Sequence, residues 1–309
     1  MDVPLPVTNV AVCAISSCWS QVTRNPVGAS LMITPPLHWS VLAVLGGVLL
    51  VIPTQAVQAI KRWQATLAKV LLAIVLLAPA FFWQPARPAN GQFDLLAIDI
   101  GQGNAVLTRT ANHSLLFDAG PRFSKESDAG HRTIVPLLRA LGERLDVLML
   151  SHRDSDHTGG ARAVLAMQPD AKVMTSVTAP ADLAALGLPA SSESCYAGQT
   201  WTWDGVRFDV LHPQKEDLDP AKKLKPNAIS CVLKITNSDA LSPQSALLAA
   251  DIEMPEEQAL LGLQAGSLSS TVLLVPHHGS KTSSSELFLD AVKPKIAIVQ
   301  AGYRNRFSH

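Results

Sequence analysis

One stretch decides the fold of this chain: Leu148-Met149-Leu150-Ser151-His152-Arg153-Asp154-Ser155-Asp156-His157-Thr158-Gly159-Gly160. Its apolar start is typical of a buried strand. Four potential metal ligands, His152, Asp154, Asp156 and His157, follow where that strand ends. Imidazole nitrogens and carboxylates at a strand end are the ligands that a two-metal hydrolytic centre needs. The plain alternative is a solvated turn rich in His and Asp, and the ligands supplied by later segments count against it.

The totals of the chain limit the class of protein. Its 309 residues allow one large domain and an appendage, and its charges balance, with 25 Lys+Arg against 25 Asp+Glu. Binding of a polyanion by this chain would therefore require a local basic patch or metal ions. The mean hydropathy of +0.21 points to membrane segments. Cys195 and Cys231 are open to two interpretations, a disulfide outside the cytosol or buried free thiols.

The first part of the chain is hydrophobic. Residues 1–36 are weakly patterned and have the features of neither a signal peptide nor a folded domain. Within 37–83, Val41–Pro53 and Val70–Trp83 are apolar runs that reach membrane-spanning length once their flanks are included. We expect two transmembrane helices here, with a pair of buried core helices as the alternative.

Basic residues predict how this hairpin is oriented. Lys61, Arg62 and Lys69 lie in or near the connection between the two apolar runs, which places the connection in the cytoplasm by the positive-inside rule. The chain after residue 83 then lies on the periplasmic or extracellular side. Residues 84–92 form a Pro/Gly-rich linker, and 93–309 form the catalytic domain.

Short apolar runs separated by turn residues alternate with helix-like segments beyond this linker, which predicts two sheets flanked by helices. The expected strands are Phe93–Ile100, Asn104–Thr108, Ser114–Phe117, Asp146–Leu150, Lys172–Thr175, Val206–Leu211, Ile229–Ile235, Ser245–Leu248, Thr271–Val275 and Lys295–Val299. The expected helices are Thr133–Leu141, Ala161–Gln168, Pro180–Leu186, Pro255–Leu263 and Ser284–Val292.

A second histidine motif follows one of the expected strands. His277 and His278 are adjacent after Thr271–Val275, so they cannot both face one metal. One of them would ligate and the other would point to substrate. The following Gly279 and Ser280 offer an N–H and a hydroxyl to a phosphate.

The pattern at residues 152–157 resembles the His-x-His-x-Asp-His signature of the metallo-β-lactamase superfamily, with Asp154 in place of the second His. The glycines of Gly101-Gln102-Gly103-Asn104 and the closing Asn-x-x-x-His of 305–309 resemble motifs of the nuclease-like domain of ComEC-type DNA-uptake proteins. This resemblance covers roughly Phe93 to His309. It implies the αβ/βα four-layer sandwich of the metallo-β-lactamase fold, preceded here by the transmembrane helical hairpin.

The resemblance also implies roles for single residues. The implied metal ligands are His152, Asp154, Asp156, His157, Asp251 and His278. Asp251 would bridge two metals, although a helix N-cap is its plain alternative. Asp118 would orient the ligands from behind, where the alternative is a carboxylate that caps a turn. His277, Ser280 and His309 would contact the phosphate or the leaving group.

The third histidine of the superfamily has no clear counterpart. The corresponding position falls near Asn227-Ala228-Ile229-Ser230, so we expect Asn227 to face the active site, with Ser230 as the alternative. His212, which precedes a proline at a strand end, is interpreted as a satisfied histidine and not as a ligand.

A carboxylate-rich set of this kind favours Mn²⁺ or Mg²⁺, with Zn²⁺ possible, as two divalent ions. The resemblance implies a metal-dependent deoxyribonuclease that degrades the non-transported strand of DNA during natural transformation. Its partners would be DNA, the inner membrane and the other domains or subunits of a DNA-uptake channel. Two alternatives are a small-molecule metallo-hydrolase of the same superfamily and a non-catalytic DNA-binding module.

Overall fold

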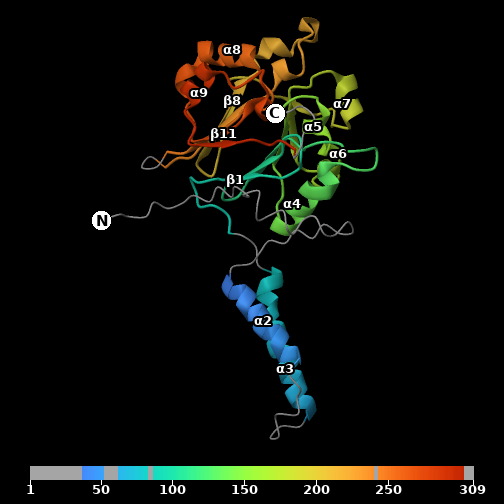
Figure 1. Cartoon of the computed structure of the whole chain (residues 1–309). Coiled ribbons are helices and arrows are strands. Elements are labelled where there is room, and N and C mark those ends of the chain that lie inside the picture. Colours follow the sequence, from blue (N-terminus) through green and yellow to red (C-terminus); the bar gives the residue numbers. More distant parts are fainter. Residues whose placement is uncertain (1–36, 52–61, 83–85, 240–242, 303–309) are drawn as a thin grey trace, which may run out of the picture. The chain divides into compact units, whose positions relative to one another are not determined.

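Two six-stranded sheets form the folded domain (Figure 1). The structure is a computed structural model that describes residues 37–51, 62–82, 86–239 and 243–302. The first sheet follows chain order: β1 (Asp94–Ala97), β2 (Val106–Arg109), β3 (Ser114–Phe117), β4 (Val147–Leu150), β5 (Lys172–Thr175) and β6 (Glu193–Ser194). The second has the order β12-β11-β10-β9-β8-β7: β7 (Thr200–Trp203), β8 (Val206–His212), β9 (Val232–Thr236), β10 (Ser245–Leu248), β11 (Val272–Leu274) and β12 (Ile296–Ile298).

Each sheet has an antiparallel half and a parallel half. β1 to β3 are antiparallel and β3 to β6 are parallel, while β7 to β10 are antiparallel and β10 to β12 are parallel. Parallel neighbours direct their carboxyl ends to the same edge of a sheet, which is where ligand sites of α/β folds lie. The loops that carry the predicted metal ligands leave from these parallel strands.

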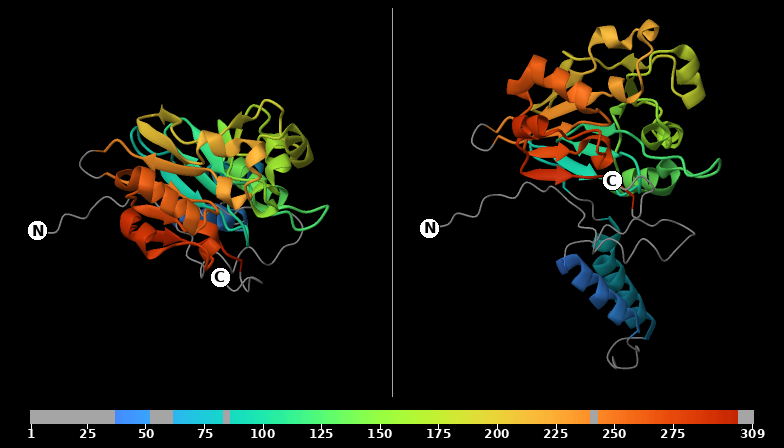
Figure 2. Two further views of the ribbon diagram at one scale, coloured as in Figure 1. Left: turned by 90° about the horizontal axis from the view of Figure 1, so that it is seen from above. Right: turned by 45° about the horizontal axis from the view of Figure 1, so that its top comes forward.

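The central strands are buried on both faces, because each sheet lies between the other sheet and a layer of helices. Phe117 and Met149 of the first sheet share one apolar core with Phe208 and Leu248 of the second. On the outer face of the second sheet, a separate core joins alternate strand residues to α8 (Met254–Gln264) and α9 (Glu286–Val292). The helices beside the first sheet are α4 (Val135–Leu141), α5 (Ser155–Thr158), α6 (Ala161–Met167) and α7 (Pro180–Leu186) (Figure 2). This arrangement is the predicted metallo-β-lactamase α/β fold.

Several element predictions agree with the structure and some do not. Ser114–Phe117, Lys172–Thr175 and Ser245–Leu248 are strands with the predicted bounds. Two strands, β6 and β7, are not among the predicted ones. Thr200–Trp203 of β7 alternates Thr with Trp and so lacks an apolar run. The Asp204-Gly205 turn that joins β7 to β8 was the available hairpin signal.

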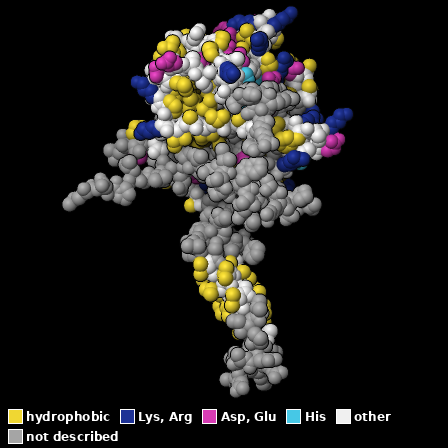
Figure 3. Space-filling model, viewed as in Figure 1, with side chains coloured by type: hydrophobic (Ala, Val, Ile, Leu, Met, Phe, Trp, Pro, Cys, Tyr) yellow, Lys and Arg dark blue, Asp and Glu magenta, His cyan; other side chains and the backbone are white. Residues whose placement is uncertain are grey.

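Helices α2 (Leu37–Val51) and α3 (Arg62–Phe82) belong to a second compact unit. They pack closely, since a Cβ on Gly46 would lie 3.1 Å from the Cβ of Leu76. Large apolar side chains are exposed along the described part of the pair (Figure 3). None of the described helices is both long and apolar enough to cross a membrane. The predicted hairpin of helices is present, therefore, but membrane spans are not shown. Residues 1–36, Lys61 and the closing 303–309 segment lie outside the described residues.

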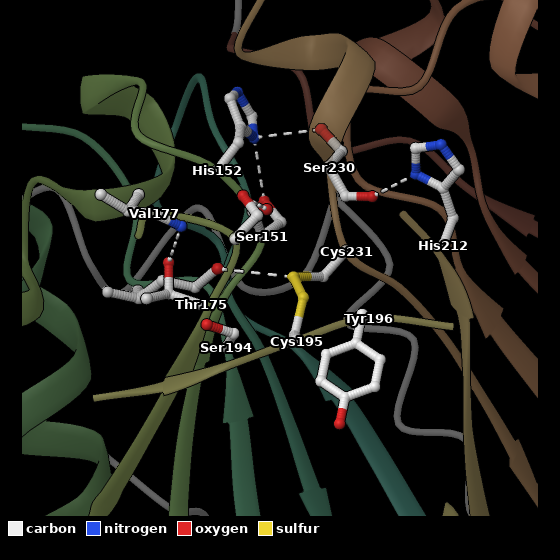
Figure 4. Close-up of a disulfide and its surroundings, with 12 residues drawn as sticks. Ser151, His152, Thr175, Val177, Ser194, Cys195, Tyr196, His212, Ser230 and Cys231 are labelled. Atoms are coloured by element: carbon white, nitrogen blue, oxygen red, sulfur yellow. Dashed lines mark hydrogen bonds between the residues drawn. A yellow bond between two sulfur atoms is a disulfide. The ribbon is translucent and has the colours of Figure 1, made fainter. Parts of the chain in front are cut away.

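A disulfide links the two sheets (Figure 4). Cys195 follows β6 and Cys231 precedes β9, and both are fully buried. The backbone N–H of Cys231 donates to the carbonyl of Ser151, the residue that follows β4. The bridge therefore holds the start of β9 against the loop that carries the histidine motif. Of the two interpretations that the sequence left open, the structure has the disulfide.

We expect the double substitution C195S/C231S to lower the free energy of unfolding by roughly 2–4 kcal/mol, because the bridge closes a loop with a sequence separation of 36. Urea titration of both proteins measures the difference. Reduction of the unsubstituted protein should reproduce the shift, and an unchanged midpoint in both cases would show that the bridge does not stabilise the fold.

Candidate metal centre

The candidate site lies at the carboxyl ends of four strands that are far apart in sequence. Asp118 follows β3, the segment 151–157 follows β4, Asp251 follows β10 and His277-His278 follows β11. Each apolar strand thus ends in a polar residue at the same edge of the sandwich. The parallel register of β3 with β4 and of β10 with β11 brings these loops to one place.

Four side chains converge there. One ligand atom from each of Asp156, His157, Asp251 and His278 lies within 4.8 Å of the other three. The Nε2 atom of His157 is 3.2 Å from Asp251 Oδ1, and the Nε2 atom of His278 is 3.3 Å from Asp156 Oδ2. These are the two-imidazole, two-carboxylate surroundings of a divalent cation.

Buried polar atoms that lack a hydrogen-bond partner indicate whether a metal ion fits this cluster. Within the described residues, Nε2 of His152, His157 and His278 and Oδ1 of Asp251 are buried and have no hydrogen-bond partner. Such groups are costly to bury and are rare in native proteins. All four are lone-pair atoms of ligating residue types, and a divalent cation would satisfy them together. The residues therefore fit the divalent metals that the sequence predicts.

His152 and Asp154 form a second, less complete half of the site. Nε2 of His152 lies 3.7 Å from Asp154 Oδ2, and the Asp154 side chain is 47% exposed whereas that of His152 is buried. If two ions were bound with Asp251 between them, as the resemblance implies, this half would have three protein ligands and the other half would have Asp156, His157, His278 and Asp251. In that arrangement, the half at His152 and Asp154 has one protein ligand fewer than the other, and we call it the less complete half.

Asp118 supports the cluster from behind, as the sequence predicts. Its Oδ1 accepts a hydrogen bond from the Ser151 N–H at 2.7 Å, and its Oδ2 accepts one from the Ser151 hydroxyl at 2.9 Å. His157 Nδ1 lies 2.8 Å from the same Oδ2. A proton held on Nδ1 leaves Nε2 of His157 directed at the cluster as a ligand.

The geometry separates the two adjacent histidines. Nδ1 of His278 donates to the carbonyl of Gln300 at 2.9 Å, which directs its Nε2 into the cluster. His277 lies at the rim, where its Nδ1 is 3.1 Å from Thr282 Oγ1 and 3.3 Å from Glu253 Oε1. Its Nε2 is 3.9 Å from Asp251 Oδ2, so one ring nitrogen faces the site and the other faces the rim.

Ser230, the alternative to Asn227 in the sequence-based prediction, lies behind His152. Its Oγ lies 3.3 Å from His152 Nδ1, and its carbonyl lies 2.8 Å from Nδ1 of His212 (Figure 4). Ser230 therefore contacts the rear nitrogen of His152 and leaves Nε2 to the metal side. His212 is a satisfied histidine, and burial holds its pKa below the usual value. Asn227, the preferred residue in the sequence reasoning, makes no side-chain hydrogen bond with the described residues.

A glycine turn buttresses the ligand loop from the side. Gly103 has φ of 123°, and a Cβ on it would lie 2.2 Å from the carbonyl oxygen of Asp156. Only glycine fits such a contact in that conformation. The next residue, Asn104, donates its N–H to the same carbonyl at 3.2 Å. The Gly-Gln-Gly motif thus holds the backbone of a predicted metal ligand.

Other predicted site residues lie further out. Ser280 is half-buried, and its hydroxyl is 3.2 Å from the hydroxyl of Thr282 near the rim. His309 lies outside the described residues. The sequence reasoning missed Ser151, which a polar residue between the apolar run and His152 could have indicated. It also missed Gln300, whose buried amide bonds Ile98 and Ala105 and which carries no local signal.

The ionised groups of the cluster stabilise one another. Burial opposes the charge of Asp156, but its hydrogen bond with His278 and the charge of His157 offset this and lower its pKa to about 2. Burial also opposes the charge of His157, yet the carboxylates of Asp251 and Asp118 raise its pKa well above the usual value. The pKa of Asp251 is lowered by the same pairing. A metal ion bound at Nε2 of His157 therefore competes with a proton for this atom.

We expect the affinity for Mn²⁺ to rise between about pH 6 and about pH 8, because a metal must compete with the proton whose release from His157 becomes easier as pH rises. Calorimetry in two buffers of different ionisation enthalpy measures both the affinity and the released proton. An affinity that stays flat over this range would show that a metal and a proton do not compete at His157.

The substitution Asp118→Ala should weaken Mn²⁺ binding by about 10- to 100-fold, since it removes the acceptor that orients His157. A matched control is Asp128→Ala, which also removes an Asp–His pair (2.8 Å to His131) but outside the ligand cluster. Equal loss of metal affinity in the two variants would argue against an orienting role for Asp118.

Comparison with known proteins agrees with this geometry. Residues 98–216 match the family described as the Metallo-beta-lactamase superfamily. The chain is 36% identical over 281 residues to "Competence protein ComA" of Neisseria gonorrhoeae, which covers 89% of this chain and 35% of that protein. It is 33% identical over 249 residues to "Recombination protein 2" of Haemophilus influenzae, with 78% and 28% covered.

A third relative is "ComE operon protein 3" of Bacillus subtilis, at 31% identity over 248 residues, with 74% of this chain and 30% of that protein covered. The chain spans about a third of the length of these relatives. The matched superfamily, the two-sheet fold and the competence relatives agree with one another. The chain fits a ComEC-type competence protein, and its folded domain has the metallo-β-lactamase α/β fold.

Proposed function

We propose that this chain carries the metal-dependent nuclease of a DNA-uptake protein, which hydrolyses phosphodiester bonds of the strand that is not transported. One observation carries the proposal: Asp156, His157, Asp251 and His278 converge, and the last three hold buried ligand atoms that have no hydrogen-bond partner. The competence proteins among the relatives support DNA as the substrate.

The carboxylate-rich ligand set supports Mn²⁺ or Mg²⁺ over Zn²⁺. Bound divalent ions would supply Lewis-acid activation of the phosphodiester and of water. Asp251, between both halves of the site, would hold two ions together. Asp118 and Gln300 orient His157 and His278 so that each presents Nε2.

His277 is suited to the leaving group. Its side chain is 22% exposed, so it can reach a bound phosphodiester while Glu253 and Thr282 hold its Nδ1 side. A proton on Nε2, directed toward the site, would assist the departing oxygen. Ser280 at the same rim would donate its hydroxyl to a phosphate oxygen.

We also propose that the catalytic domain lies on the periplasmic or extracellular side of the inner membrane. The disulfide supports an oxidising compartment. The exposed apolar side chains of α2 and α3, such as Val44 and Val75 at 65% each, support attachment to the membrane. Fractionation of cells with alkaline extraction, followed by protease treatment of intact spheroplasts, tests both parts of this proposal.

We expect the chain to cleave single-stranded DNA in the presence of Mn²⁺, and Asp156→Ala to reduce this to the level of the metal-free protein, because it removes a ligand of the complete half-site. Asp290→Ala, which changes an exposed aspartate on α9, is the matched control. Turnover should be followed on labelled DNA and on bis(p-nitrophenyl) phosphate with Mn²⁺, Mg²⁺ or Zn²⁺.

The two alternatives give different results in the same assay. Turnover of bis(p-nitrophenyl) phosphate without cleavage of DNA would favour a small-molecule hydrolase. Normal metal loading without turnover of either compound would favour a binding module. The argument for this alternative is that the third histidine of the superfamily has no clear counterpart in the sequence near Ser230. Either result would overturn the nuclease proposal.

A further inference from the structure

A cavity of about 340 Å³ lies beside the metal centre. Four segments form it: the ligand loop after β4, the loop Ser176–Ala179 after β5, the start of α7 with Asp182, and the region between Asp217 and Ile229. Its volume is within the range of about 300–1,000 Å³ that is typical of small-molecule sites. None of the predicted metal ligands lines it, so it is a separate feature of the fold.

The cavity shares walls with the less complete half of the site. Arg153, which lines it, is placed in the chain between the predicted ligands His152 and Asp154. Ser176 donates its hydroxyl to the carbonyl of Ser151 at 2.8 Å. On the opposite wall, Ile229 precedes Ser230, whose hydroxyl reaches His152 at 3.3 Å. A ligand in the cavity would therefore adjoin a phosphodiester bound at the metals.

The charges of the cavity do not suit a phosphate. Three carboxylates line it (Asp182, Asp217 and Asp219) with two cations (Arg153 and Lys223), and Lys222 pairs with Asp217 at 2.9 Å, so the cavity has no net positive charge. Arg153 is 3.6 Å from Asp182, so part of its charge is already compensated. An anion would therefore find no net attraction here, whereas a neutral group with N–H donors would find carboxylate oxygens as acceptors.

The remaining lining is apolar and suits a flat ring. Val177, Leu224 and Ile229 are among the apolar side chains that line it. A nucleobase combines an apolar face with amino or imino donors at its edge, and bases commonly stack on apolar and aromatic side chains of single-strand binding proteins. The apolar face of a base thus matches the apolar side chains of the lining, and its N–H donors match the carboxylates.

We propose that this cavity binds the base of the nucleotide next to the phosphodiester that is cleaved, with the base packed on Leu224 and Ile229 and its edge directed at the carboxylates. The proposal rests on the nuclease function and deepens it. It makes the base, and not only the sugar-phosphate backbone, a determinant of substrate binding.

Equilibrium binding tests this without turnover. The whole chain, with metal removed by chelator, is titrated with fluorescent single-stranded oligothymidylate and with an oligomer of the same length whose nucleotides all lack a base. We expect the base-bearing strand to bind at least about fivefold more tightly, since stacked bases contribute strongly to single-strand affinity.

The variant Leu224→Ala makes the test specific to the cavity. Leu224 is 41% exposed, so its truncation leaves the core intact, and Leu263 on α8, which is also exposed (64%), provides Leu263→Ala as the control. Leu224→Ala should weaken binding of the base-bearing strand about threefold or more and leave the base-free strand unchanged. Leu263→Ala should change neither.

Equal affinity of the unsubstituted protein for the two strands would overturn the inference, as would an equal effect of Leu224→Ala on both. These outcomes are independent of hydrolysis. Failure of the nuclease proposal appears as intact DNA and intact bis(p-nitrophenyl) phosphate, whereas failure of the cavity proposal appears as loss of base discrimination in a binding curve.

Discussion

The buried carboxylate of Asp118 is the interaction on which the rest of the site depends. It accepts both hydrogen bonds of Ser151 and faces Nδ1 of His157, all between 2.7 and 2.9 Å. Asp118 follows β3, whereas Ser151 and His157 lie in the loop after β4. One side chain therefore fixes the position of one strand end relative to the other. The direction of His157 Nε2, and with it the ion pair to Asp251 in the other sheet, follows from this contact.

Around this contact the fold brings together charges that could not be buried alone. Two histidines and two carboxylates, of which only Asp156 is partly exposed (32%), offset one another's desolvation, which is why the pKa of Asp156 is low and that of His157 is high. The remaining unpaired lone pairs are the sign of a metal centre. Behind His152, the hydroxyl of Ser230 lies 3.3 Å from Nδ1 of His152 and its carbonyl accepts from His212.

Much of the fold and of the ligand set was accessible from the chain itself. Apolar runs that end in polar residues predicted most strands, and the residues of the cluster Asp156, His157, Asp251 and His278 were all among the predicted ligands. The predictions failed where local pattern is absent. The Thr-Trp alternation of β7 lacks an apolar run, so this strand was not predicted.

The sequence by itself determined which chemistry is available, since ligand types and their order along the chain are local properties of residues 152–157, 251 and 277–278. Tertiary structure alone decided which atoms meet. Gln300 bonds Ala105 across 195 residues and accepts from His278, and this contact distinguishes His278 from its neighbour. Cys195 and Cys231 pair, and the cavity beside Arg153 exists, because segments from both sheets close on each other. Contacts at such separations leave no periodic trace in a single sequence, since they depend on the packing of the whole sandwich.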